Sequence, residues 1–203
     1  MKITVVDYGM GNIKSITTTL NFLGVDEVLI TNNFEELKNS EKIILPGVGS
    51  FAKAMSKINE HKIDQILNEL VIINKKPLLG ICLGMQLLCK SSTEDGNTNG
   101  LAFIDADVTR FEDYDIKIPH VGFNQIKKNI TSILFKEIND NSDFYFTHSY
   151  KVTSSKNINQ SMCNYGQTFI AAFEVDNIYA TQFHPELSQN NGLKLLKNFL
   201  NES

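Results

Sequence analysis

The segment PLLGICLGMQLL, residues 77–88, gives the first indication of the fold class. Its first five residues are largely apolar without alternation, which is typical of a strand buried on both faces of a parallel sheet. A helical pattern of apolar residues follows from Met85 to Cys89. Because α/β domains are built from strands that lead directly into helices, we expect an α/β fold.

Further apolar runs precede this segment, and helical patterns separate them. The predicted strands are residues 3–6, 28–30, 43–45 and 78–81. Helical spacing joins Ile13, Ile16, Leu20 and Leu23 behind a candidate cap at Asn12, and residues 58–73 carry a second amphipathic pattern. The first half of the chain therefore predicts a doubly wound unit, with a mostly parallel central sheet and flanking helices.

The pattern changes after Gly100, where predicted strands follow one another through short connections. They are residues 108–111, 116–118, 144–147, 169–175 and 178–183, and a last helix is predicted from about residue 191 to residue 200. This arrangement favours an added antiparallel portion on the same core. No linker, repeat or low-complexity stretch divides the chain, so we expect residues 1–203 to form one domain.

Composition excludes several classes of protein. The chain has 203 residues, is 42% hydrophobic and carries a net charge of −4, and its basic residues form no cluster larger than a doublet. Nucleic-acid binding is therefore not expected. Three cysteines without a Cys-x-x-Cys pair indicate neither a disulfide framework nor a zinc site. The N-terminus contains no run typical of a signal peptide, and no run approaches a membrane span, so we expect a cytoplasmic protein without a membrane partner.

Cys82 lies in the pattern Gly80-Ile81-Cys82-Leu83-Gly84, at the junction of the predicted strand and helix. This pattern is typical of a nucleophile elbow with Cys in the nucleophile position. Flanking glycines relieve crowding in such a turn, and a helix N-terminus favours a thiolate. Taken alone, the pattern is also compatible with an inert buried cysteine.

The segment QFHPE at residues 182–186 supplies a base and a carboxylate. The residue before a proline favours an extended conformation, and side chains two apart on an extended segment point to the same side. We therefore expect His184 and Glu186 to touch, with Glu186 orienting the imidazole. The alternative is a surface histidine beside a solvated glutamate. Together with Cys82, the pair predicts a Cys-His-Glu triad.

These motifs resemble those of the class I glutamine amidotransferases, and in particular the glutaminase subunits of imidazole glycerol phosphate synthases. The similarity runs nearly from end to end. The segments DYGMGN (7–12) and PGVG (46–49), and Met85-Gln86 after the elbow, favour this group over other glutaminases. The matching segments are VDYGMGN (6–12), LPGVGSF (45–51), GICLGMQLL (80–88), PHVGFN (119–124), YFTHSY (145–150) and QFHPE (182–186).

The resemblance implies a single-domain amidotransferase fold and hydrolysis of L-glutamine through a thioester on Cys82, with no cofactor and no metal. It places one oxyanion donor at the backbone N–H of Leu83. The second is placed in the loop Gly47-Val48-Gly49, here called the glycine loop, at the N–H of Val48 or Gly49. It also places four residues around the bound glutamine: Gln86, Glu94, Ser149 and Tyr150. On the residues alone, the glycine loop is compatible with an ordinary turn, and Glu94 with a solvated side chain.

The resemblance further implies a heterodimer with a (β/α)₈ cyclase subunit that receives the ammonia. The expected interface residues are Asn12, His120, Phe123, Asn124 and Leu187. At two of these positions the chain departs from the group, which usually has Trp in place of Phe123 and Lys in place of Leu187. Asp105-Ala106-Asp107 replaces a glycine of the group. These departures leave the triad intact and bear on the partner.

Several alternatives remain open at this point. The chain could be a related glutaminase that supplies ammonia for amidation of a surface sugar, a catalytically inactive regulatory subunit, or a general cysteine hydrolase of similar fold. The glycines near Asn12 do not match a dinucleotide loop, because the third glycine of that fingerprint would fall at Lys14. His61 is expected at the surface, and Cys89 and Cys163 as packed thiols.

Overall fold

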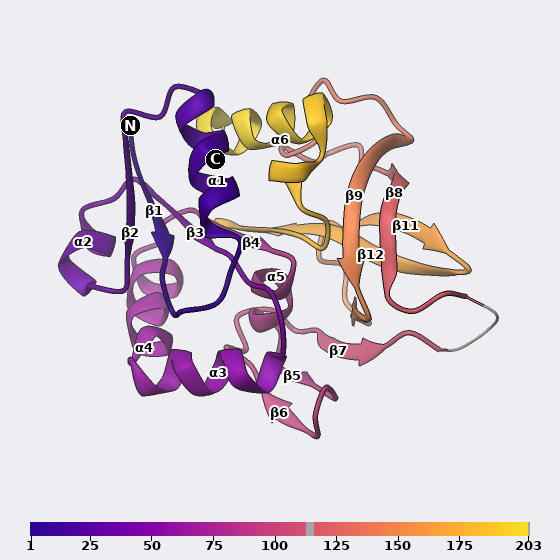
Figure 1. Ribbon diagram of the computed structural model, residues 1–203, viewed down its shortest axis with the longest axis horizontal. Coiled ribbons are helices and arrows are strands. Elements are labelled where there is room, and N and C mark those ends of the chain that lie inside the picture. The colour runs from indigo at the N-terminus through magenta and orange to yellow at the C-terminus, as the bar shows by residue number, and fades with distance from the viewer. Residues whose placement is uncertain (113–115, 203) are drawn as a thin grey trace.

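The structure, a computed structural model, describes residues 1–112 and 116–202. Its central sheet has a parallel part with the strand order β2-β1-β3-β4-β13 (Figure 1). The four strands predicted in the first half are confirmed. The bounds of the parallel strands are β1 Lys2–Val6, β2 Glu27–Thr31, β3 Lys42–Leu45, β4 Leu78–Ile81 and β13 Ile178–Thr181.

Helices cover both faces of the parallel part. Successive residues of β3 alternate between the faces, so that Ile43 and Leu45 join one hydrophobic core and Ile44 joins the other. Helices α1 (Ile13–Phe22) and α6 (Gln189–Glu202) pack on one side, and α3 (Phe51–Glu60), α4 (Ile63–Leu67) and α5 (Leu83–Leu87) pack on the other (Figure 1). Both cores are buried, which explains why the strands lack alternation.

The remaining helices are short. They are α2 (Phe34–Lys38), the π-helix η1 (Asn68–Ile73) and the 3₁₀ turn η2 (Pro185–Leu187). The amphipathic pattern at residues 58–73 does not form one helix, because Lys62 adopts a left-handed φ of 56° and separates α3 from α4. Asn12 occupies the cap position of α1, although its side chain makes no capping hydrogen bond. Among the described residues no helix is long and apolar enough to cross a membrane.

An antiparallel portion continues the sheet beyond β13, as predicted. Strand β12 pairs antiparallel with β13, and β11 and β8 extend the sheet to β9. Most pairs here are antiparallel, with β5 and β7 the parallel exception. The bounds are β5 Ser91–Ser92, β6 Thr98–Asn99, β7 Asp107–Arg110, β8 His120–Lys127, β9 Ser142–His148, β10 Tyr150–Thr153, β11 Ser161–Tyr165 and β12 Gln167–Val175.

One predicted strand is wrong, and several strands were missed. Residues 116–118 form no strand, and β8 begins only at His120, after Pro119. Proline has no backbone N–H for a ladder, so pairing starts beyond it. Strand β11 has the sequence SMCNY, which carries no β-branched residue to indicate it.

Two histidines form a buried pair between β8 and β9. His120 and His148 lie opposite each other in the register, and His120 Nδ1 lies 3.0 Å from His148 Nε2. His148 Nδ1 lies 2.8 Å from the carbonyl oxygen of Tyr150. Since a carbonyl only accepts, His148 Nδ1 carries the proton, its Nε2 accepts, and His120 Nδ1 donates. Burial lowers the pKa of His120 to about 4 and that of His148 to about 3, so both rings are neutral at pH 7.

The expectation that His120 lies at a partner interface is wrong, because its side chain is buried. The imidazole of His120 is 2% exposed and stacks between Phe146 and Tyr165, with ring centroids 4.8 and 3.9 Å away. Its side chain therefore offers no surface to a docking partner. Strand β8 turns alternate residues inward, and His120 is one of these.

Because both histidines are neutral in the folded chain, we predict that the free energy of unfolding decreases as the pH is lowered below about 6.5. The unfolded chain takes up a proton on each histidine below its ordinary pKa of 6.5, whereas the folded chain does not until about pH 4 or 3. Each site then lowers the free energy of unfolding by up to about 1.4 kcal/mol per pH unit. Urea denaturation between pH 6.5 and 5 should show this slope.

The double variant His120→Phe with His148→Phe should have a flatter pH dependence in that range. The matched control is His61→Asn, because His61 is exposed. Equal slopes for the double variant and the unmodified chain would contradict the assignment of two neutral histidines.

Candidate active site

Cys82 lies in a sharp turn between β4 and α5. Its backbone has φ 54° and ψ −108°, which is strained for a residue with a side chain. Its N–H donates to the Thr181 carbonyl oxygen at 2.7 Å, which ties the turn to β13. The strand-to-helix turn predicted from Gly80–Gly84 is present, and Cys82 is 6% exposed at its tip.

The glycines of this turn are required by close main-chain contacts. A Cβ on Gly84 would lie 1.9 Å from the carbonyl oxygen of Leu45, and a Cβ on Gly80 would lie 3.0 Å from the Gly84 carbonyl group. A residue with a Cβ therefore cannot replace Gly84 unless the main chain moves. The end of β3 therefore packs directly against the first turn of α5.

His184 and Glu186 form a buried hydrogen-bonded pair. His184 Nδ1 lies 2.9 Å from Glu186 Oε1, and the two side chains are 3% and 0% exposed. The contact agrees with the expectation from sequence, but its geometry differs. Only His184 is extended, whereas Pro185–Leu187 form a 3₁₀ turn that brings Glu186 to the imidazole.

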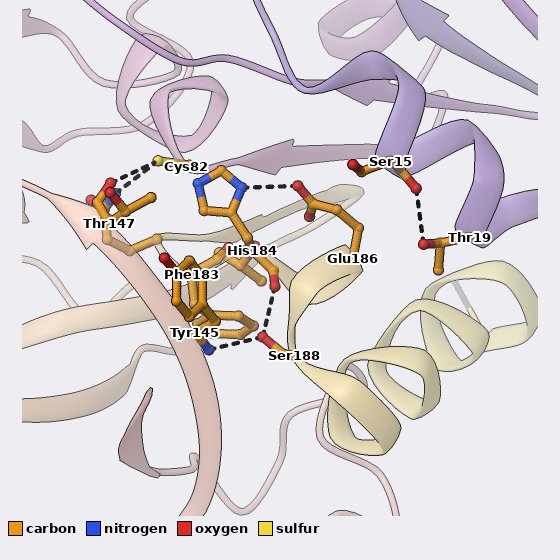
Figure 2. Close-up of polar contacts among 11 residues, drawn as sticks. Ser15, Thr19, Cys82, Tyr145, Thr147, Phe183, His184, Glu186 and Ser188 are labelled. Carbon is orange, nitrogen blue, oxygen red and sulfur yellow. Dashed lines mark hydrogen bonds and ion pairs between the residues drawn. The ribbon is translucent and has the colours of Figure 1, made fainter. Parts of the chain in front are cut away.

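A second set of bonds fixes the main chain of His184 (Figure 2). Its N–H donates to the Tyr145 carbonyl oxygen at 2.9 Å, and the Ser188 hydroxyl donates to the His184 carbonyl oxygen at 2.6 Å. The same hydroxyl accepts the Tyr145 N–H at 2.9 Å. Strand β9 and the start of α6 thus hold the imidazole in place.

The imidazole lies between Cys82 and Glu186 (Figure 2). Its Nε2 is buried and has no hydrogen-bond partner among the described residues. Burial alone would lower the pKa of His184, but its interactions with Cys82 and Glu186 outweigh burial and raise the pKa to about 10. His184 therefore carries a proton at neutral pH, which it can give to a leaving amine.

A cavity of about 450 Å³ opens beside Cys82 and His184. All the residues predicted for the oxyanion hole and for glutamine binding line it, although they come from segments far apart in sequence. Thr147 and His148, to which no role was assigned from sequence, also line it. The predicted residues in its wall are Val48, Gly49, Leu83, Gln86, Glu94, Ser149 and Tyr150.

Hydrogen bonds define which atoms in this wall remain free. Gln86 Nε2 donates to the Tyr150 carbonyl oxygen at 3.1 Å and to Gln182 Oε1 at 3.0 Å, so both of its amide hydrogens are engaged. Glu94 Oε2 accepts the N–H of Phe51 at 2.9 Å, and burial raises the pKa of Glu94 despite this bond. Glu94 is half-buried rather than solvated.

Gln182 is a contact of Cys82 to which the sequence analysis gave no role. Its Nε2 lies 3.8 Å from Cys82 Sγ, and the Thr147 carbonyl oxygen lies 3.9 Å from the same sulfur. Gln182 sits two residues before His184 in the QFHPE segment. That spacing on an extended segment is a signal that could have placed both side chains on the nucleophile's side.

The residues expected at a partner interface are not part of this cavity. Phe123 is 48% exposed and Leu187 40% exposed, and the Phe123 ring meets Tyr145 edge-on at 5.5 Å. Asn12 is half-buried, and Asn124 is bound to the Asn164 carbonyl oxygen. Phe123 and Leu187 are thus the two apolar side chains of this set that are open to contact.

The other candidate residues lie apart from the cavity. Cys89 and Cys163 are buried thiols, and burial raises the pKa of both, that of Cys163 to about 12. His61 is exposed, as expected. Within the two described ranges, no three His, Cys, Asp or Glu side chains gather in a way that could hold a metal ion.

Comparisons with known proteins show the family to which this chain belongs. The family model of class I glutamine amidotransferases matches residues 4–203. The imidazole glycerol phosphate synthase subunit HisH 1 of Campylobacter jejuni is 43% identical, with 97% of this chain and 98% of that protein covered. Subunit HisH 2 of Methanococcus maripaludis is 44% identical over 99% of this chain and all of that protein.

Among solved structures, PurLQS from Thermotoga maritima has a similar fold, with a TM-score of 0.75. The two sequences are 17% identical, and the alignment covers 98% of this chain and 97% of that chain. The expected amidotransferase fold is confirmed. The chain belongs to the class I glutamine amidotransferases, in the group of the HisH subunits of imidazole glycerol phosphate synthase.

Proposed function

We propose that this chain hydrolyses L-glutamine to glutamate and ammonia at Cys82, and that the ammonia passes to a (β/α)₈ cyclase subunit in cytoplasmic histidine biosynthesis. The observation that carries the proposal is the hydrogen-bonded His184–Glu186 pair beside the strained Cys82 turn, all at the wall of one cavity. The relatives named HisH support the assignment to this pathway.

Glutamine would bind with its α-amino acid end away from Cys82. Because both amide hydrogens of Gln86 are engaged, its carbonyl oxygen is the atom left to accept from the α-ammonium group. The Glu94 carboxylate supplies the matching negative charge. Ser149 and Tyr150 line the cavity on the β9–β10 side, where they would contact the rest of the substrate.

The first half-reaction forms a thioester. With the thiol proton of Cys82 held on His184 Nε2, Cys82 Sγ attacks the side-chain carbonyl carbon of glutamine. The carbonyl oxygen becomes an oxyanion that the Leu83 N–H and an N–H at Val48 or Gly49 would stabilise. The carbon–nitrogen bond then breaks while His184 Nε2 gives its proton to the leaving nitrogen. Ammonia departs, and the γ-glutamyl group remains on Cys82.

The second half-reaction hydrolyses the thioester. His184 Nε2, now without its proton, takes one from a water molecule that attacks the thioester carbon. A second oxyanion forms in the same position, the carbon–sulfur bond breaks, and glutamate leaves. Glu186 would keep the imidazole oriented and favour its protonated form throughout, without contacting the substrate.

The partner would dock on the face that carries Phe123 and Leu187, near Asn12 and Asn124. An exposed phenylalanine is suited to anchor an interface, and Leu187 favours an apolar patch opposite it, since it cannot form an ion pair. His120 takes no part in this docking surface because it is buried.

Complementation tests the chemistry and the pathway together. Expressed with its own cyclase, the chain should restore growth without histidine to a strain that lacks its glutaminase subunit under ammonia-poor conditions. The variant Cys82→Ala should restore growth only when ammonium salts are added, because it lacks the nucleophile but leaves the cyclase intact. Cys163→Ala removes a buried thiol outside the cavity and is the matched control.

Glutamine-dependent growth with Cys82→Ala would contradict the thioester mechanism. Failure of the unmodified chain to complement, combined with glutamine hydrolysis by the purified complex, would contradict the pathway and favour the sugar-amidating alternative.

A charge at the docking face should weaken the complex. We expect Phe123→Glu or Leu187→Glu to lower the affinity for the cyclase about 10- to 100-fold, as for the loss of an interface anchor. Titration calorimetry measures this affinity. The control is Ile73→Glu, since Ile73 is 66% exposed on η1, away from this face. Equal affinities for all four proteins would place the interface elsewhere.

A further inference from the structure

Tyr8 is a buried tyrosine whose hydroxyl reaches the base of the glycine loop. It is 2% exposed and follows β1, and its hydroxyl donates to the Pro46 carbonyl oxygen at 2.7 Å. Burial, followed by the nearby charge of Cys82, raises the pKa of Tyr8, so the hydroxyl keeps its proton and remains a donor. A buried phenol needs such a partner, and this one is a main-chain atom.

Gly47, which follows Pro46, has no room for a side chain. A Cβ on Gly47 would lie 2.6 Å from Tyr8 Oη, 2.8 Å from Leu83 Cβ and 2.9 Å from the Gly84 nitrogen. The hydroxyl, the Pro46–Gly47 peptide and the first residues of α5 therefore meet at one point with no space between them.

This point adjoins both segments that carry the proposed oxyanion donors. Leu83 begins α5 on one side, and Val48 and Gly49 follow Gly47 on the other. A peptide group is planar, so a bond that fixes the Pro46 carbonyl direction also fixes the plane from which the loop continues. Rotation of that peptide would leave a buried carbonyl and a buried hydroxyl without hydrogen-bond partners, which is unfavourable.

We propose that Tyr8 is a positioning residue that sets the glycine loop against the start of α5, so that both oxyanion donors point to the same place. The inference rests on the proposed glutaminase function. Tyr8 does not line the cavity and its hydroxyl is engaged with Pro46, so it acts through the loop rather than on the substrate.

The variant Tyr8→Phe tests this role in the complex with the cyclase. It removes one oxygen and keeps the ring that fills the core. We expect kcat for glutamine hydrolysis to fall about 10- to 100-fold, which is less than the loss of a whole oxyanion donor, while KM changes little. Thermal denaturation should show a folded protein.

Alkylation of Cys82 by iodoacetamide distinguishes misplaced oxyanion donors from a general disruption of the active site. It occurs by direct displacement at the sulfur and forms no oxyanion, so the alkylation rate of Cys82, located by peptide mass spectrometry, should match that of the unmodified chain. Tyr179→Phe removes another buried tyrosine hydroxyl, on β13, and should leave both rates unchanged.

Unchanged kcat in Tyr8→Phe would overturn the proposal, as would a parallel fall in hydrolysis and alkylation, which would indicate general disruption of the site. Failure of the proposed function itself would look different, because the unmodified complex would then not hydrolyse glutamine.

Discussion

The close contact between the end of β3 and the first turn of α5 is the constraint on which the site depends. Gly84 packs so near the Leu45 carbonyl oxygen that a Cβ would lie 1.9 Å from it. This contact leaves little room in the turn, and Cys82 takes a left-handed φ of 54° between β4 and the helix. Such strain persists only where the surrounding structure fixes it. The nucleophile is thereby presented at the tip of a rigid element.

The sheet order brings the rest of the site to this turn. Strand β4 lies between β3 and β13, and all three run in the same direction. Their carboxyl ends therefore meet at one edge, which is where ligands bind in open α/β sheets. The glycine loop follows β3, Cys82 follows β4, and His184 comes shortly after β13. The antiparallel portion adds β9, which holds the His184 main chain through Tyr145, and β10, which contributes Tyr150 to the cavity wall.

Local patterns in the sequence predicted much of this, and tertiary contacts account for what they missed. The spacing of His184 and Glu186 reflects a constraint within a few residues, and the glycines around Cys82 form a short motif, so both could be recognised, although the contact that requires Gly84 is made with Leu45 far along the chain. Residues 116–118 have strand-like composition but form no ladder with any strand of the described residues, because strand pairing depends on partners far along the chain. For the same reason the burial of His120 and the bond from Tyr8 to Pro46 could not be predicted.

Trapping the covalent intermediate tests directly whether Cys82 is the nucleophile. The complex of this chain with its cyclase is quenched by acid during glutamine turnover, and its peptides are analysed by mass spectrometry. A thioester mechanism at Cys82 predicts a γ-glutamyl group on the peptide that contains Cys82, and none on the same peptide of Cys82→Ala. A γ-glutamyl group on another residue, or ammonia release by Cys82→Ala, would contradict the central claim that this turn carries the nucleophile.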